Sequence, residues 1–197
     1  MTSIGLRTAV LTFVKRHFRL ALVLTFAMPL QCATLERLSL DDMITKSSSI
    51  VRGKVSSSYA AFSGPVVYTH YVIQVSERFK GAAAGDQVEV LVPGGAVKGQ
   101  RQSFAGTPSL TGESEYVFFL WTSRSGLTQL IGLTQGLFSV SADTSGDPFA
   151  TRAATRELML DSSSGQPVKD QTLKMHLSEL RSRISRTLAT AGAGGGK

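Results

Sequence analysis

The chain has 197 residues, of which 42% are hydrophobic and 18% are charged, and these proportions exclude an intrinsically disordered protein. The formal net charge is +7, but four of the 21 basic residues lie in residues 1–33, which contain no acidic residue. The remainder therefore carries 17 basic against 14 acidic residues, scattered without a cationic run. Nucleic-acid binding needs clustered cations, so we expect no nucleic-acid partner.

Residues 1–33 have the order of a secretory signal peptide. Four basic residues lie within the first 19 positions, an apolar run of 11 residues follows at 20–30, and Ala33 ends the segment. The run is shorter than the roughly 20 residues of a membrane span. We therefore expect an exported protein, periplasmic or secreted. Its only expected membrane contact is this segment, if it stays uncleaved or if Cys32 is lipidated.

The rest of the chain lacks the usual motifs of metal binding and catalysis. Residues 34–197 contain no cysteine, so the exported domain must fold without disulfides. His70 and His176 lie 106 residues apart, which matches no zinc motif. No serine lies in a GxSxG or SxxK motif. We expect no metal site, no cofactor and no catalytic residues, and His70 is interpreted as structural or exposed.

Local patterns predict a short helix followed by a series of strands. Ser39 and Asp42 have the spacing of a capping box, which predicts a helix over residues 40–47. Alternating or continuous apolar residues bounded by Gly and Pro then predict strands. The strands are expected at residues 50–55, 66–79, 88–92, 116–121, 127–133, 137–140 and 158–160.

Residues 94–112 are rich in Gly, Ser and Pro and contain few apolar residues, so they are predicted to form a long loop. Long loops in compact domains are often functional. Arg101, Gln102 and Phe104 are the polar and aromatic groups of this loop that can contact a partner, so they are the candidate binding residues. Backbone amides after Pro93 are a second, weaker candidate for binding a phosphate.

A second helix is predicted near the C-terminus. Apolar residues at 173, 177, 180, 184 and 188 form one helical stripe. An isolated helix of this length is marginal in water, so we expect it to pack on its own domain. Arg181, Arg183 and Arg186 are expected to face solvent, and residues 189–197 are expected to be a flexible tail.

The predicted architecture is a mainly β, β-rich α+β domain over residues 34–188. Short strands at about ten-residue spacing with Gly-rich turns indicate a small antiparallel barrel or sandwich. We expect an OB-like barrel, flanked by a short N-terminal helix and a C-terminal amphipathic helix.

A set of strand-and-turn motifs supports this architecture by resemblance. The motifs are Ile50-Val51-x-Gly53-x-Val55, Tyr71-x-Ile73-x-Val75 with Phe79-Lys80-Gly81, Val88-x-Val90, and Gly112-Glu113 followed by residues 116–120. Together they resemble the OB-like barrel of netrin-module and TIMP-type proteins over about residues 50–120. That family inhibits zinc proteases through a disulfide-anchored N-terminal cysteine, whereas Cys32 has no partner cysteine. The strand pattern is also similar to that of exported bacterial proteins of uncharacterised function.

These patterns favour a non-enzymatic binding or adaptor module of the cell envelope or secreted space, whose partner is a protein or an envelope component. OB-like barrels bind through a sheet face and the adjoining loops. One alternative is an exported protease-associated inhibitor or chaperone. Another is an enzyme without a recognisable motif, with its site among His70, Arg101, Glu113 and Glu115.

Overall fold

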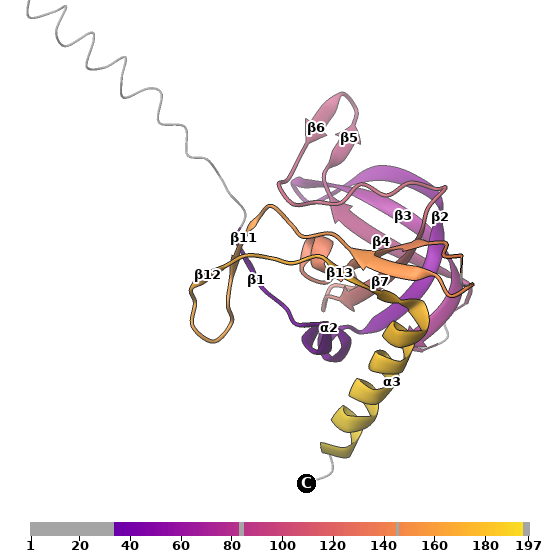
Figure 1. Ribbon diagram of the computed structural model, residues 1–197. Coiled ribbons are helices and arrows are strands. Elements are labelled where there is room, and N and C mark those ends of the chain that lie inside the picture. The colour runs from indigo at the N-terminus through magenta and orange to yellow at the C-terminus, as the bar shows by residue number, and fades with distance from the viewer. Residues whose placement is uncertain (1–33, 83–84, 145, 195–197) are drawn as a thin grey trace, which may run out of the picture. The chain divides into compact units, whose positions relative to one another are not determined.

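The computed structural model describes residues 34–82, 85–144 and 146–194, so the predicted signal peptide and Cys32 lie outside the described residues. The described chain is mainly β, with thirteen strands, two α-helices and one 3-10 helix. The main sheet is antiparallel throughout, and its strand order is β13-β10-β9-β7-β2-β3-β4, with β8 paired to β7 (Figure 1). Its strands are β2 (Ser49–Ser63), β3 (Val66–Lys80), β4 (Gln87–Pro93), β7 (Glu115–Thr122), β8 (Thr128–Leu130), β9 (Leu137–Ser141), β10 (Phe149–Arg152) and β13 (Leu173–His176).

Strand β7 lies in the middle of the sheet and is buried on both faces, as its continuous apolar run predicts. Val117 and Phe119 point to the side covered by the helices, whereas Phe118 and Leu120 point to the opposite side. The helix-side cluster contains Met43, Ile44, Ile50, Val117, Phe119, Ile131, Phe138, Ala150, Leu177, Leu180 and Ile184. The inner cluster contains Val51, Ile73, Val90, Val92, Leu110, Tyr116, Phe118, Leu120 and Leu130.

Strands β2 and β3 form a long hairpin joined by the predicted turn, in which Gly64 has a positive φ of 60°. Each strand has 15 residues, so β2 runs well past the predicted end at residue 55. Three register shifts between the two strands, at Ile50/Val51, Arg52/Gly53 and Val55/Ser57, bend the hairpin. The apolar alternation stops near Val55, and the three consecutive serines that follow it give no strand signal in the sequence.

The bent sheet brings β4 against β8. Strands β8 and β9 lie along the same edge of β7, separated by the 3-10 helix η1 (Leu133–Gly136). Among the described residues, β4 and β13 are the two ends of the sheet, and no hydrogen-bonded strand pair closes it. The predicted mainly β, antiparallel architecture is confirmed at this level.

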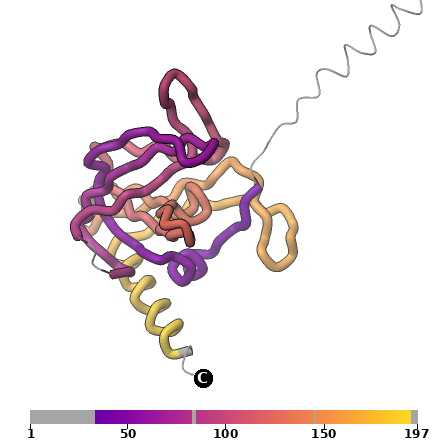
Figure 2. Tube along the Cα trace, turned by 180° about the vertical axis from the view of Figure 1, so that it is seen from behind, coloured from indigo at the N-terminus to yellow at the C-terminus, as the bar shows by residue number. Residues whose placement is uncertain are grey.

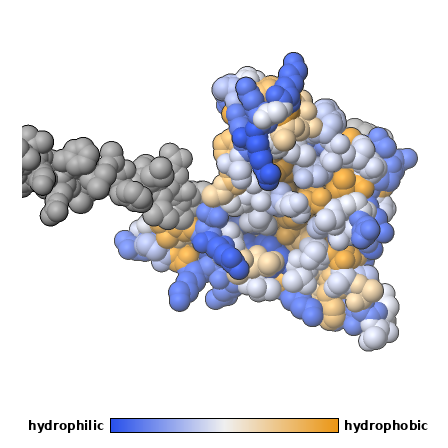
Figure 3. Space-filling model, turned by 90° about the horizontal axis from the view of Figure 1, so that it is seen from above, coloured by the Kyte–Doolittle hydropathy of each residue, from blue (hydrophilic) through white to orange (hydrophobic). Residues whose placement is uncertain are grey.

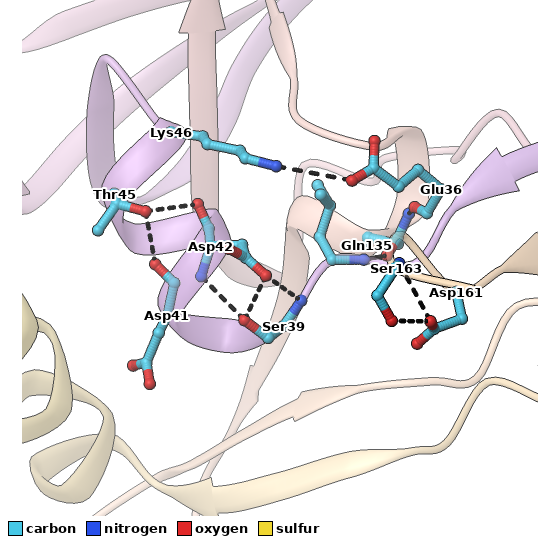
Figure 4. Close-up of polar contacts among 10 residues, drawn as sticks. Glu36, Ser39, Asp41, Asp42, Thr45, Lys46, Gln135, Asp161 and Ser163 are labelled. Carbon is cyan, nitrogen blue, oxygen red and sulfur yellow. Dashed lines mark hydrogen bonds and ion pairs between the residues drawn. The ribbon is translucent and has the colours of Figure 1, made fainter. Parts of the chain in front are cut away.

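Helix α2 (Leu40–Lys46) begins with the predicted capping box (Figure 4). The Asp42 backbone N–H donates to Ser39 Oγ over 3.0 Å, and the Ser39 backbone N–H donates to Asp42 Oδ2 over 3.1 Å. These bonds satisfy donors at the helix N-terminus that have no partner within the helix. Met43 and Ile44 are fully buried in the helix-side cluster, so α2 covers part of the sheet.

The C-terminal helix packs on its own domain, as predicted, because Leu177, Leu180 and Ile184 are buried in the helix-side cluster. The predicted start of this helix is wrong. Residues 173–176 form strand β13 against β10, and α3 is Leu177–Gly194. The stripe misleads because Leu173 and Met175 also contact the helix-side cluster, by the two-residue period of a strand.

The arginines expected to face solvent on α3 are exposed, and two of them also form ion pairs within the chain. Arg181 binds Glu77 of β3 through Nε and Nη2, at 2.8 and 3.0 Å. Arg183 binds both carboxylate oxygens of Asp41 on α2, with Nε 2.8 Å from Oδ1. These pairs connect α3 to the sheet and to α2, and they were not predicted from the sequence.

A small second sheet holds the start of the described chain. It consists of β1 (Thr34–Glu36), β11 (Leu158–Leu160) and β12 (Pro167–Val168), and the β1–β11 pairing is parallel, which the sequence did not predict. The buried Gln135 side chain accepts from the Leu38 N–H and donates to the Glu36 carbonyl, both over 2.9 Å (Figure 4). These bonds tie the segment after β1 to η1.

Candidate functional site

A two-stranded hairpin, β5 (Gly95–Val97) and β6 (Gln100–Gln102), projects from the body of the domain (Figures 1 and 2). It lies inside the segment 94–112 that the sequence predicts to be a continuous loop, so that prediction is wrong for these eight residues. Lys98 and Gly99 both have positive φ, 49° and 77°, as in a type I′ turn. The hairpin is not predictable from the sequence, because its strands are short and carry no apolar alternation.

The base of the hairpin is fixed by hydrogen bonds to β3 and to the turn before it. The Gln102 side chain accepts from the Val67 N–H over 2.7 Å and donates to the Pro65 carbonyl over 2.9 Å. The Gly94 N–H donates to the Val67 carbonyl, and the Thr69 hydroxyl donates to the Gly94 carbonyl over 2.8 Å. Gln102, predicted to contact a partner, therefore holds the hairpin in place.

Gly95 lets the hairpin approach the sheet closely. Its φ is 140°, in a region that side-chain-bearing residues rarely adopt. A Cβ at this position would lie 2.8 Å from Thr69 Oγ1 and 3.2 Å from Ala60 Cβ. Only glycine therefore allows β5 to approach β2 and β3 this closely.

A cleft of 320 Å³ lies between the hairpin, the ends of β3 and β4, and the segment after β6. Figure 3 views the molecule from the side on which the hairpin projects, where hydrophilic and hydrophobic residues are interspersed. The cleft is lined by Thr69, Tyr71, Val92, Pro93, Gly94, Gly95, Ala96, Arg101, Gln102, Ser103, Thr107, Pro108 and Ser109.

Arg101 is the only charged residue among those that line the cleft. It is exposed, and its guanidinium has no hydrogen bond or ion pair with any residue in the described part of the chain. An unpaired cation beside a cavity that contains no carboxylate produces a local positive potential that favours an anion. The structure thus places Arg101, which was predicted to be a binding residue, in a cleft where its charge is unpaired.

The third predicted residue, Phe104, lies just outside the cleft. It is 40% exposed, and its ring lies within 3.8 Å of the Cβ position of Gly94. Thr69 and Tyr71 line the cleft without having been predicted as site residues. The sequence feature that could have identified them is the two-residue alternation of β3, which places both residues on the same face of the strand.

The backbone amides after Pro93 were a second candidate for binding a phosphate. The first of them, the Gly94 N–H, cannot do so, because it donates to the Val67 carbonyl over 2.7 Å. Within residues 34–82, 85–144 and 146–194, no three His, Cys, Asp or Glu residues are grouped so that they could hold a metal ion.

The groups considered for an unrecognised enzyme are not brought together. Glu115 binds Arg52 over 2.7 Å, and the Glu115 carboxylate also accepts from Ser76. Glu113 is exposed in the turn before β7. Neither of these glutamates lines the cleft that contains Arg101.

His70 lies in a separate cluster, between β2 and β4. Its ring stacks on Tyr59 with centroids 4.5 Å apart, and its Nδ1 lies 3.2 Å from Glu89 Oε1. The Tyr59 hydroxyl donates to the same carboxylate oxygen over 2.7 Å, which raises the pKa of Tyr59. Because the Tyr59 hydroxyl already occupies the Glu89 oxygen, the contacts of His70 are those of a cross-strand packing group.

In comparisons with protein-family models, curated proteins and solved structures, no significant match to the chain was found. No helix within the described part of the chain is long and apolar enough to cross a membrane. Function is therefore inferred from the geometry of the cleft.

Proposed function

We propose that this protein is an exported, non-enzymatic binding or adaptor module that engages a protein or envelope component at the cleft beneath the β5–β6 hairpin. The observation that carries the proposal is the unpaired Arg101 in a cleft without acidic residues. Proteins place polar and charged groups sparingly in such concave sites, where those groups orient a ligand.

Three other arginines differ from Arg101 because each forms an ion pair within the chain. Arg52 pairs with Glu115, Arg152 with Asp170, and Arg181 with Glu77. Each of these ion pairs joins two elements or segments of the fold. Arg101 makes no such contact in the described part of the chain, so its charge does not serve the fold. It is free to serve a partner.

The proposal includes an OB-like arrangement of the sheet. The bent antiparallel sheet brings β4 against β8 around the inner cluster, which is how a small barrel encloses its core. In this proposal, side-chain packing between β4 and β8 takes the place of hydrogen-bonded closure. The hairpin and the segment after β6 then correspond to the loops at one end of such a barrel, the usual place for a ligand.

The test is site-specific photocrosslinking in the organism that makes the protein. A photoreactive residue at Ser103, in the cleft, is compared with one at Ser164, in the turn between β11 and β12. We expect a discrete crosslinked product from position 103 that is absent from position 164. Arg101→Gln should remove the product while leaving the melting temperature unchanged.

The proposal is wrong if position 103 gives no product, or if Arg101→Gln leaves the product unchanged. Lys98→Gln is the matched control, since Lys98 lies in the same hairpin but does not line the cleft. It should retain the product of the wild-type protein.

A further inference from the structure

We infer that the cleft binds a single carboxylate on a small, partly apolar molecule or chain end, with the Arg101 guanidinium as its counter-ion. This inference rests on the proposed binding function and names the chemistry of the ligand. It follows from three features of the cleft: its charge, its remaining hydrogen-bond donors and its apolar wall.

The charge of the cleft fits one negative charge. Arg101 supplies one cation, and none of the other lining residues is charged. The planar guanidinium presents paired N–H groups whose spacing matches the two oxygens of a carboxylate. A neutral ligand would leave the cation unpaired, and a second negative charge would find no counter-ion in the cleft.

The donors that remain free are few. The Thr69 hydroxyl donates to the Gly94 carbonyl, the Thr107 hydroxyl donates to the Phe104 carbonyl, and the Gly94 amide is also used. The hydroxyls of Tyr71, Ser103 and Ser109 have no hydrogen bond to other described residues. Three hydroxyls and one guanidinium can satisfy two carboxylate oxygens. A guanidinium also pairs with phosphate oxygens, but a doubly charged phosphate would leave one charge without a counter-ion in this cleft, whereas phosphate sites commonly add backbone amides or further cations.

The apolar part of the lining accounts for the rest of the ligand. Val92, Pro93, Pro108 and the ring of Tyr71 line the cleft together with the polar groups. Pockets for small molecules combine such apolar walls with a small number of polar groups that fix orientation. A volume of 320 Å³ is at the low end for small-molecule sites, so it suits a short carboxylic acid or the last residues of a peptide.

The inference is tested by titrating the ¹⁵N-labelled protein, purified from the cells that export it, and following backbone amide shifts. The probes are N-acetyl-alanyl-alanine, its C-terminal amide, butyrate and inorganic phosphate. We expect saturable shifts at Gly94, Gly95 and Ser103 with the free acid. The amide should bind about tenfold more weakly or worse, because it lacks the charge, and phosphate should leave these signals in place.

Arg101→Gln should weaken binding of the free acid by about tenfold or more, whereas Lys98→Gln should change it little. Binding of butyrate as tight as that of the peptide identifies a free carboxylic acid as the source, and tighter binding of the peptide identifies a chain end. Both outcomes support carboxylate recognition. Equal binding of acid and amide, phosphate shifts at the same residues, or an unchanged Arg101→Gln variant would overturn it.

The two proposals fail separately. If the crosslink at position 103 depends on Arg101 but no carboxylate binds, the ligand chemistry is wrong and the binding site stands. If neither the crosslink nor the titration depends on Arg101, both the ligand chemistry and the proposed function are wrong.

Discussion

Asp41 at the start of α2 accepts hydrogen bonds from both Arg183 and Thr187 of α3, residues that follow it by more than 140 positions. The ion pair joins α2 and α3, the two helices that cover one face of the sheet. The hydrogen bond from Arg183 is the main cause of the lowered pKa of Asp41, followed by that from Thr187.

This pair predicts a pH-dependent contribution to stability. The folded state lowers the pKa of Asp41 below the ordinary 3.8, so it favours the carboxylate more than the unfolded chain does. The contribution is therefore complete above about pH 5, and is lost as the pH falls through the folded pKa. Asp41→Asn should lower the free energy of unfolding at pH 7, and the difference from wild type should shrink below about pH 4.

Urea denaturation between pH 3 and pH 7, in steps of about one unit, measures this difference. Asp86→Asn is the control, since its exposed carboxylate has no hydrogen-bonded partner in the described part of the chain. The side chains of Asp41 and Arg183 are 45% and 47% exposed, so solvent screens their interaction and the expected effect on stability is small. A difference for Asp41→Asn that is the same at every pH would contradict the assignment.

Leu180→Ala should destabilise the protein by about 2–5 kcal/mol, because the Leu180 side chain is fully buried between α3 and the sheet. Ser185→Ala on the exposed side of the same helix changes no buried contact and should be close to neutral. Thermal and urea unfolding of both variants provides the measurement. Equal stability of the two variants would show that α3 does not pack on its own domain.

Asp170→Ala should cost about 3–5 kcal/mol, because it leaves the buried Arg152 without its carboxylate. The side chains of this pair are only 4% and 1% exposed, and Arg152 Nη2 lies 2.6 Å from Asp170 Oδ1. Lys169→Ala changes the exposed neighbouring residue and serves as the control. A melting temperature of Asp170→Ala matching that of the control would mean that the pair contributes nothing to the fold.

Gly95→Ala should disturb the cleft while leaving the core intact. The new Cβ combines an unfavourable φ with a 2.8 Å approach to Thr69 Oγ1, so we expect a cost of about 1 kcal/mol or more. Gly99→Ala has a positive φ but meets no atom within 4 Å, so it isolates the backbone effect. Hydrogen exchange of the β5 and β6 amides should accelerate more in Gly95→Ala, and equal acceleration would refute the close contact.

Local patterns in the sequence were sufficient to predict much of the fold. The Ser39–Asp42 capping box, the alternation along β3 and the apolar run of β7 each depend on neighbouring residues, so each was predicted correctly. Leu173 was assigned to the wrong element because its spacing to Leu177 fits a helix. In the structure its backbone pairs with Arg152 of β10, so it belongs to a strand. Arg183 and Asp41 are too distant in sequence for their pairing to be predicted.

The candidate site was predictable only in part. Arg101 was selected because it is a charged group in a segment with few apolar residues, and the structure places it in a cleft. The role of Gln102 could not be predicted, since it depends on Val67 and Pro65, which lie 35 and 37 residues earlier in the chain. Tyr71 lines the cleft only because β4 and the hairpin fold back over β3.

Whether a partner occupies the cleft at Arg101 is tested most directly with phenylglyoxal, which modifies accessible guanidinium groups. Modification is quantified by mass spectrometry in the intact cells that export the protein and in the purified protein, with Arg124 in the turn between β7 and β8 as the exposed control. If the cleft is occupied by its partner, Arg101 is protected in cells and becomes reactive on purification, whereas Arg124 reacts equally in both. Equal reactivity of Arg101 in cells and after purification would show that no partner occupies the cleft, and the proposed function would be wrong.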